Sequence, residues 1–222
     1  MAKKTVTIGD LEGAQVFIDL DGDGIKGPNE VAATFDVKSG KYVMSGKSSQ
    51  LKGTIVASGG KDKTTGADNT TVFTAPKDAK VVNSMTTLIN ETAKEMGISA
   101  SKAAKTIATS LGLEKISGGT LLSKTPEQIV ASAGKSASKL EAAANVFEAT
   151  KQIDTLVKMG AAVLAGATGG TGPTASALQG GLVKAIAASI ASGVPIEFSS
   201  ATQLSRSEST RLNSSHGIIW VG

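Results

Sequence analysis

The stretch AQVFIDLDGDGIKGPNEVAATFDV, residues 14–37, decides the fold of the N-terminal half of the chain. Its two ends are short runs of Val, Ile, Phe and Thr that alternate as in a β-strand, so that Val16 and Ile18 oppose Phe17. Between these runs lies the acidic, glycine-rich segment DLDGDGIKGPNE, residues 19–30. The stretch therefore predicts two strands joined by an acidic loop.

The acidic loop has the pattern of a twelve-residue calcium loop, D-x-D-x-D-G with a Glu at position twelve. Calcium is a hard cation that takes six to eight oxygen ligands at about 2.3–2.6 Å. The expected ligands are the carboxylates of Asp19, Asp21, Asp23 and Glu30 and the main-chain carbonyl of Ile25. Because four acids this close in sequence repel one another, the loop should be destabilising without a cation. The sequence thus predicts a Ca2+ site.

Strands on both sides of the loop distinguish it from an EF-hand, which needs flanking helices. Gly24 permits the sharp turn and Gly27 stands at the water-mediated position, so the loop chemistry is retained. We expect a structural ion, with no helix-opening sensor behaviour and a Kd on the order of 10⁻⁴–10⁻³ M, as in extracellular modules. The alternative is a solvated acidic hairpin turn, since Asp-Gly is itself a turn signal.

Strand-like patterns extend to about residue 80, and helical patterns follow. The expected strands cover residues 5–8, 14–20, 31–37, 41–45, 50–57 and 70–74. From Val81 onward the apolar residues recur at helical spacing, and Gly97, Ser99 and the capping box that begins at Thr125 mark helix ends. We expect an α+β chain with an antiparallel β-sandwich over residues 1–80 and an α-helical domain over residues 81–204.

Composition excludes several classes of function. The 222 residues include no Cys, which excludes a Cys nucleophile and a thiolate metal site, and a single His cannot build a multi-His site. The net charge is +4 and aromatics make up only 3%, whereas a nucleic-acid binder would cluster basic residues and interleave aromatics. The apolar stretches fall short of roughly 18 residues or carry a Lys. We therefore expect no nucleic-acid partner and no transmembrane segment.

The C-terminal segment, residues 205–222, differs in composition from the rest of the chain. It contains Arg206 and Arg211, which are the only Arg residues, together with the only His and the only Trp. The sequence SRSESTRLNSSHGIIW resembles the translated adapter read-through that ends some metagenomic reading frames. We expect a non-native or disordered tail; the alternative is an ordinary polar C-terminus.

Within the acidic loop, Gly22-x-Gly24-x-x-Gly27 also matches a dinucleotide fingerprint after a strand. A pyrophosphate needs a positive nest, however, and here it would face Asp21 and Asp23. The expected βαβ continuation is missing as well. Nucleotide binding is therefore the weaker interpretation of these glycines.

Three further patterns are weaker evidence for a functional site. The glycines of a near P-loop at residues 40–48 are one position too far apart. The Ser-x-x-Lys pairs, among them Ser99/Lys102, Ser132/Lys135 and Ser136/Lys139, lack the other motifs of serine acylases. A second acidic loop, residues 59–69, would hold a cation through Asp62 and Asp68, although its lysines favour a plain polar loop.

The first ninety or so residues resemble a module of large bacterial surface proteins. The segments that carry the resemblance are VFIDLDGDGIKGPNE, FDVKSGKYVMSG and the run from GTIVASGG through TAPKDAKVVNSMTTLI. They are similar to the calcium-dependent B-type repeats of Gram-positive adhesins and to segments of Gram-negative secreted repeat proteins. The resemblance implies an immunoglobulin-like or transthyretin-like sandwich, calcium ligands at Asp19, Asp21, Asp23 and Glu30, and adhesive or structural work at the cell surface.

These observations together predict a non-enzymatic, calcium-stabilised extracellular module of a bacterial adhesin, matrix or fibre protein. A strand at residues 5–8 that Gly9 and Asp10 detach from the sheet would complete a neighbour's sheet, giving a homo-oligomer or filament by strand addition. One alternative is a small-ligand or nucleotide-binding enzyme domain that uses the Gly-rich loops. Another is a membrane-perturbing helical protein.

Overall fold

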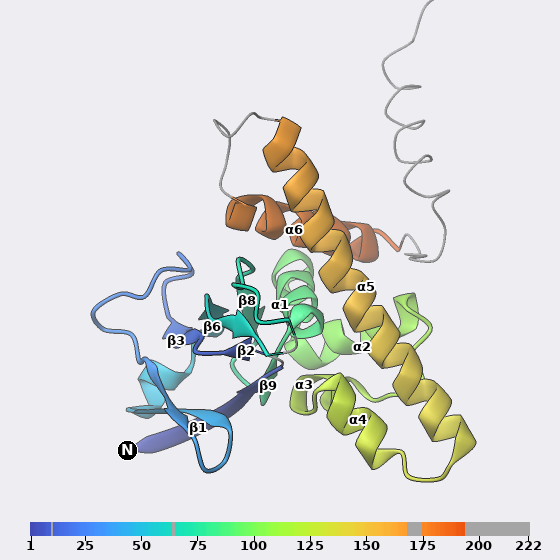
Figure 1. Ribbon diagram of the computed structural model, residues 1–222, viewed down its shortest axis with the longest axis horizontal. Helices are drawn as coiled ribbons and strands as arrows, with labels where there is room; N and C mark the ends of the chain where they lie inside the picture. The colour runs from blue at the N-terminus through green and yellow to red at the C-terminus, as the bar shows by residue number, and fades with distance from the viewer. Residues whose placement is uncertain (10, 64, 168–174, 194–222) are drawn as a thin grey trace, which may run out of the picture.

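The computed structural model describes residues 1–9, 11–63, 65–167 and 175–193. Within these residues, small sheets come first in the chain and six α-helices follow. The strands lie on one side of the molecule and the helices on the other (Figure 1). The expected α+β class is confirmed, while the expected tail at 205–222 lies outside the described residues.

A four-stranded sheet has the order β4-β5-β1-β9. Its strands are β1 (Ala2–Ile8), β4 (Ala33–Asp36), β5 (Lys41–Gly46) and β9 (Val81–Val82). β1 pairs antiparallel with β5 and parallel with β9.

Two expectations about this sheet are wrong. The N-terminal strand is not detached, because burying Val6 and Ile8 requires β1 to enter the sheet; their exposed fractions are 0% and 4%. The pairing is not antiparallel throughout, because β1 and β9 run in the same direction.

A second sheet is antiparallel and has the order β3-β6-β8. It consists of β3 (Gln15–Asp19), β6 (Thr54–Ser58) and β8 (Phe73–Ala75), and β2 (Leu11–Glu12) pairs separately with β7 (Lys61–Asp62). The two larger sheets meet where Ile18 N donates to the Val31 carbonyl at 3.0 Å, beside a bridge between Phe17 and Ala32. The described strands form no closed sandwich or barrel.

Two expected boundaries shift for local reasons. A 3₁₀ turn, η1 (Ser48–Leu51), replaces the start of the strand expected at residues 50–57, since the Gln50 side chain accepts the Lys47 N–H at 3.0 Å. Val81, expected at the start of the helical half, still belongs to the sheet as β9.

The helices are α1 (Ser84–Met96), α2 (Ala100–Ser110), α3 (Gly118–Ser123), α4 (Pro126–Ser132), α5 (Ala137–Ala167) and α6 (Ala175–Ala191). The predicted helix ends are confirmed: Gly97 ends α1 with a φ of 62°, Ser99 caps α2, and Thr125 and Gln128 form the capping box of α4. α3 was not expected, because its first two residues are glycines, but Ser117 caps it.

The buried apolar residues of both halves form one connected core. From the sheets it includes Val6, Ile18 and Met44, and it continues through Leu88 of α1 to Ile190 of α6. Among the described residues, no helix is long and apolar enough to cross a membrane.

Candidate metal centre

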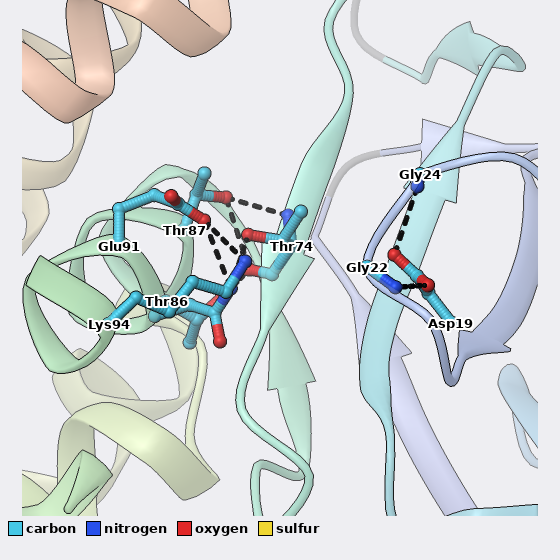
Figure 2. A network of polar contacts seen from close by, with 9 residues as sticks. Asp19, Gly22, Gly24, Thr74, Thr86, Thr87, Glu91 and Lys94 are labelled. Atoms are coloured by element: carbon cyan, nitrogen blue, oxygen red, sulfur yellow. Dashed lines mark hydrogen bonds and ion pairs between the residues drawn. The ribbon is translucent and has the colours of Figure 1, made fainter. Parts of the chain in front are cut away.

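Asp19 is the last residue of β3 and shapes the turn that follows it. Its side chain is buried, with Oδ1 accepting the Gly22 N–H at 2.6 Å and Oδ2 accepting the Gly24 N–H at 3.1 Å, as Figure 2 shows. Gly22 and Gly24 have φ values of 85° and 74°, in the left-handed region that favours glycine. One carboxylate therefore folds the first half of the loop around itself.

Asp21 and Asp23 project from the loop and are exposed. Each accepts a backbone N–H two residues on: Asp21 Oδ1 from Asp23 at 3.2 Å, and Asp23 Oδ1 from Ile25 at 2.7 Å. These local bonds hold the two carboxylates on the same tight turn as Asp19. One oxygen from each of Asp19, Asp21 and Asp23 lies within 4.8 Å of the other two.

This spacing fits a common cation. Two oxygens bound to one calcium ion at about 2.3–2.6 Å lie at most about 5.2 Å apart. Although Asp19 already accepts two backbone N–H groups, each carboxylate oxygen has a second lone pair for a metal. Among the ion pairs of the described residues, none neutralises an acid of the loop.

Glu30 ties the two ends of the loop together. It is buried, its Oε1 accepts the Leu20 N–H at 2.5 Å, and its Oε2 accepts the Gly27 N–H at 2.8 Å. The group of carboxylates within 4.8 Å of one another does not include Glu30. The bidentate metal contact of Glu30 therefore stays a prediction. The contact from the main-chain carbonyl of Ile25, a residue that is 71% exposed, also stays a prediction.

Gly53 supports the site from the neighbouring strand and was missed by the sequence analysis. A Cβ at this position would overlap the carbonyl of Asp19 and would come within 2.8 Å of the Ile18 side chain. Glycine therefore lets β6 start directly beside the end of β3, where Asp19 pairs with Thr54. The available signal was a Gly inside the strand predicted over residues 50–57, since glycine in a strand often marks close approach of another backbone.

The acidic loop borders a groove of about 1000 Å³ that separates it from the helices. Asp23 and Ile25 lie on the loop side of the groove, and Glu91, Lys94 and Glu95 of α1 on the other. Glu91 and Lys94 form an ion pair at 3.0 Å, which Figure 2 shows across β8 from the loop. This pairing leaves the helical side of the groove without a large excess of either charge.

α1 and the edge of β8 are joined by threonine side chains (Figure 2). The Thr74 N–H donates to Thr87 Oγ1 at 2.9 Å, and the Thr74 carbonyl lies 3.1 Å from Thr87 Oγ1 and 3.2 Å from Thr86 Oγ1. Both main-chain groups of Thr74 that face away from β6 thus have side-chain partners. The side chains of Thr86 and Thr87 therefore cover the edge of β8.

In the second acidic loop, Asp62 and Asp68 make different contacts. Asp62 Oδ1 accepts the Thr65 N–H at 2.8 Å, whereas Asp68 lies 3.8 Å from Lys61 Nζ in an exposed ion pair. Within the described part of the chain, the acidic group with metal-like spacing is Asp19, Asp21 and Asp23. The geometry favours a plain polar loop at residues 59–69.

The main-chain N–H groups of the glycines in the dinucleotide-like pattern already donate hydrogen bonds to carboxylates of the loop. The N–H groups of Gly22 and Gly24 point at Asp19, and that of Gly27 points at Glu30. The element after the loop is β4, where a dinucleotide fold has a helix.

Comparison of the chain with family models, curated proteins and solved structures found no match.

Proposed function

We propose that the protein is a non-enzymatic, calcium-stabilised structural module of a bacterial surface adhesin, matrix or fibre protein. The observation that carries the proposal is the cluster of Asp19, Asp21 and Asp23, whose oxygens lie within 4.8 Å of one another on a loop that backbone hydrogen bonds pre-shape. The role is structural because the loop joins two strands, with no flanking helices to open.

Calcium fits this donor set better than a transition metal. The three clustered residues offer only carboxylate oxygens, and hard oxygen ligands suit calcium or magnesium, whereas zinc prefers nitrogen and sulfur. Magnesium demands a near-ideal octahedron at about 2.0–2.1 Å and keeps several waters, whereas calcium tolerates an irregular loop. When bound, the ion would neutralise the clustered carboxylates and fix the loop against β3.

The extracellular placement rests on the resemblance of residues 5–90 to adhesin modules and on the weak affinity expected of such loops. A Kd on the order of 10⁻⁴–10⁻³ M is useful only where calcium is millimolar, as outside cells. The absence of Cys is compatible with this placement, since a bound cation would supply the cross-link that disulfides give other small secreted domains. The described strands close no sandwich, but the two larger sheets share one core, and we further propose that they are an open form of the immunoglobulin-like or transthyretin-like sandwich that the resemblance implies.

Thermal and urea unfolding with and without calcium test the proposal. For the Kd range above, about 10 mM calcium raises the free energy of unfolding by about 1.4–2.7 kcal/mol over the same protein in chelator. The double variant Asp21→Asn/Asp23→Asn should lose this increase. It should unfold no more easily than the parent in chelator, because the repulsion between carboxylates is relieved.

Asp36→Asn is the matched control, since Asp36 is an exposed acid at the end of β4 that accepts hydrogen bonds from the Lys38 N–H and the Ser39 hydroxyl. This variant should keep the full calcium effect. A parent protein whose unfolding is the same in calcium and in chelator would contradict the proposed function.

A further inference from the structure

The groove beside the acidic loop is bounded by strands on one side and by α1, α5 and α6 on the other. Its walls are mainly apolar and include Phe73 of β8, Ile153 of α5 and Val183 of α6. A cavity of about 460 Å³ continues from the groove, because Phe73, Ser84 and Gln179 line both spaces. This size and this lining are typical of small-molecule sites.

Two side-chain oxygens in the wall of the groove have no hydrogen-bond partner among the described residues. They are Oγ1 of Thr71, two residues before β8, and Oε1 of Gln179 on α6, and each residue is only 4% exposed. A buried polar group without a partner is costly, and the large majority of such groups in native proteins have one. We therefore expect these oxygens to find a partner that comes from the groove.

Gly180 leaves free space at the helical wall of the groove. It lies inside α6, where glycine is less favourable than alanine because it loses more backbone entropy. Close packing does not explain this choice, since a Cβ at Gly180 would meet no atom of the described residues within 4 Å. Because Gly180 lines the groove, the space beside it is room for a ligand.

The groups of the groove favour a neutral ligand with hydroxyl groups. Gln179 Oε1 can only accept a hydrogen bond, whereas the Thr71 hydroxyl can donate or accept, so the ligand has to present a donor. The apolar walls oppose a charged ligand, and the acids Asp23 and Glu95 oppose an anion in particular. A sugar meets these conditions, since its O–H groups both donate and accept and the C–H faces of its ring can pack on apolar side chains.

We infer that the groove binds a small neutral sugar, with Thr71 and Gln179 as its hydrogen-bonding residues and Gly180 as the position that leaves room for the ring. Neighbouring atoms cover both oxygens, so binding includes a rotation of the two side chains toward the groove. Sugar binding is a second function beside the proposed structural role, and none of the three residues belongs to the acidic loop.

Saturation-transfer NMR on the full chain tests the inference, with glucose, galactose, mannose and N-acetylglucosamine as probes. At least one of the four sugars should receive saturation from the protein, both in calcium and in chelator. Thr71→Val and Gln179→Met remove the two oxygens at nearly constant size. Each should weaken binding about tenfold, which is the effect of one lost hydrogen bond. Thr71→Val should unfold at no lower a urea concentration than the parent, because it removes an unpaired buried hydroxyl.

Gly180→Leu and Gly181→Leu are a matched pair. Both glycines lie inside α6, and an added Cβ at either would meet no described atom within 4 Å. Gly180 lines the groove, whereas Gly181 is not among its lining residues. We therefore expect Gly180→Leu to abolish sugar binding and Gly181→Leu to leave the Kd within about twofold of the parent value.

Three outcomes would overturn the inference. The first is that none of the four sugars receives saturation, including the case in which 1,4-diaminobutane does and the groove takes cations instead. The second is binding that Gly180→Leu leaves unchanged. The third is a Thr71→Val variant that binds like the parent and unfolds at a lower urea concentration, because the hydroxyl would then serve the fold through an ordered water only. Calcium-dependent unfolding is a separate measurement, so failure of the calcium proposal would leave sugar binding in chelator intact.

Discussion

Glu30 acts on the loop through the backbone, whether or not a cation is bound. Both of its oxygens accept main-chain N–H groups, from Leu20 and Gly27, in a buried position. In Glu30→Gln, an NH2 group replaces one acceptor and faces a backbone donor. We expect the free energy of unfolding in chelator to fall by about 1–3 kcal/mol, measured by urea titration.

Glu114→Gln is the control for this variant, because Glu114 is exposed on the helical half. If both variants unfolded at the same urea concentration in chelator, Glu30 would not hold the loop ends together. This test separates Glu30 from Asp21 and Asp23, whose replacement should lower the free energy of unfolding only with calcium present.

Tyr42 gives a pH-dependent signal that can be assigned without ambiguity, since it is the only Tyr in the chain. Burial, with a smaller contribution from the charge of Glu12, raises the pKa of its phenol above the ordinary 10.0, although the N–H that Ala14 donates to the phenol oxygen opposes this. The folded state thus favours the neutral phenol. Its contribution to stability is complete below pH 10 and is lost as the pH rises through the folded pKa.

The ultraviolet absorbance of the phenolate measures this pKa directly. Its midpoint should lie above 10.0 in the folded protein and return to about 10 in urea. Tyr42→Phe should remove the absorbance change and the part of the alkaline destabilisation that belongs to this group. Equal midpoints in the two states would show that the fold does not perturb Tyr42.

The sequence pattern predicted the acidic loop because the residues of the loop form hydrogen bonds with residues close to them in the sequence. Asp19 contacts residues only three and five positions later. The support from Gly53 was not foreseen, because it depends on β3 and β6 lying side by side. Local chemistry can be read from spacing, whereas contacts between strands depend on pairing that spacing does not encode.

At the scale of elements, the threonines of α1 hold the helical half to β8. Thr87→Val keeps the side-chain shape but leaves the Thr74 N–H without its acceptor. We expect a loss of about 1–3 kcal/mol in the free energy of unfolding and faster hydrogen exchange at the Thr74 N–H.

Thr106→Val on α2 is the matched control. Thr106 Oγ1 only donates back to the Lys102 carbonyl within its own helix, at 3.1 Å, so little should change. Unaltered exchange at Thr74 in Thr87→Val would mean that the hydroxyl does not cover the edge of β8.

Helix ends were predicted better than strand partners. Gly97 and the capping box at Thr125 act within four residues, and both stand where the sequence placed them. For β1, the pattern identified a strand but not its place between β5 and β9. The parallel pairing with β9 joins residues far apart in the chain, and no local signal specifies it.

At the scale of the whole molecule, one core connects the sheets to the helices. Because Ile18 and Leu88 belong to the same buried cluster, the two halves should unfold together. We expect helical circular dichroism and Tyr42 fluorescence to follow one transition, and calcium to shift both signals equally. If calcium moved the Tyr42 transition alone, the halves would be independent folding units.

The parallel pairing of β1 with β9 sets an order of events on the ribosome. β1 is synthesised first, yet the sheet is complete only after Val82, the partner of Ile8, has emerged. At about 5–20 residues per second, the nascent chain waits roughly 4–15 s between these two residues. During that interval β1 has only β5 beside it, so the growing chain exposes an open strand edge that the finished protein no longer has.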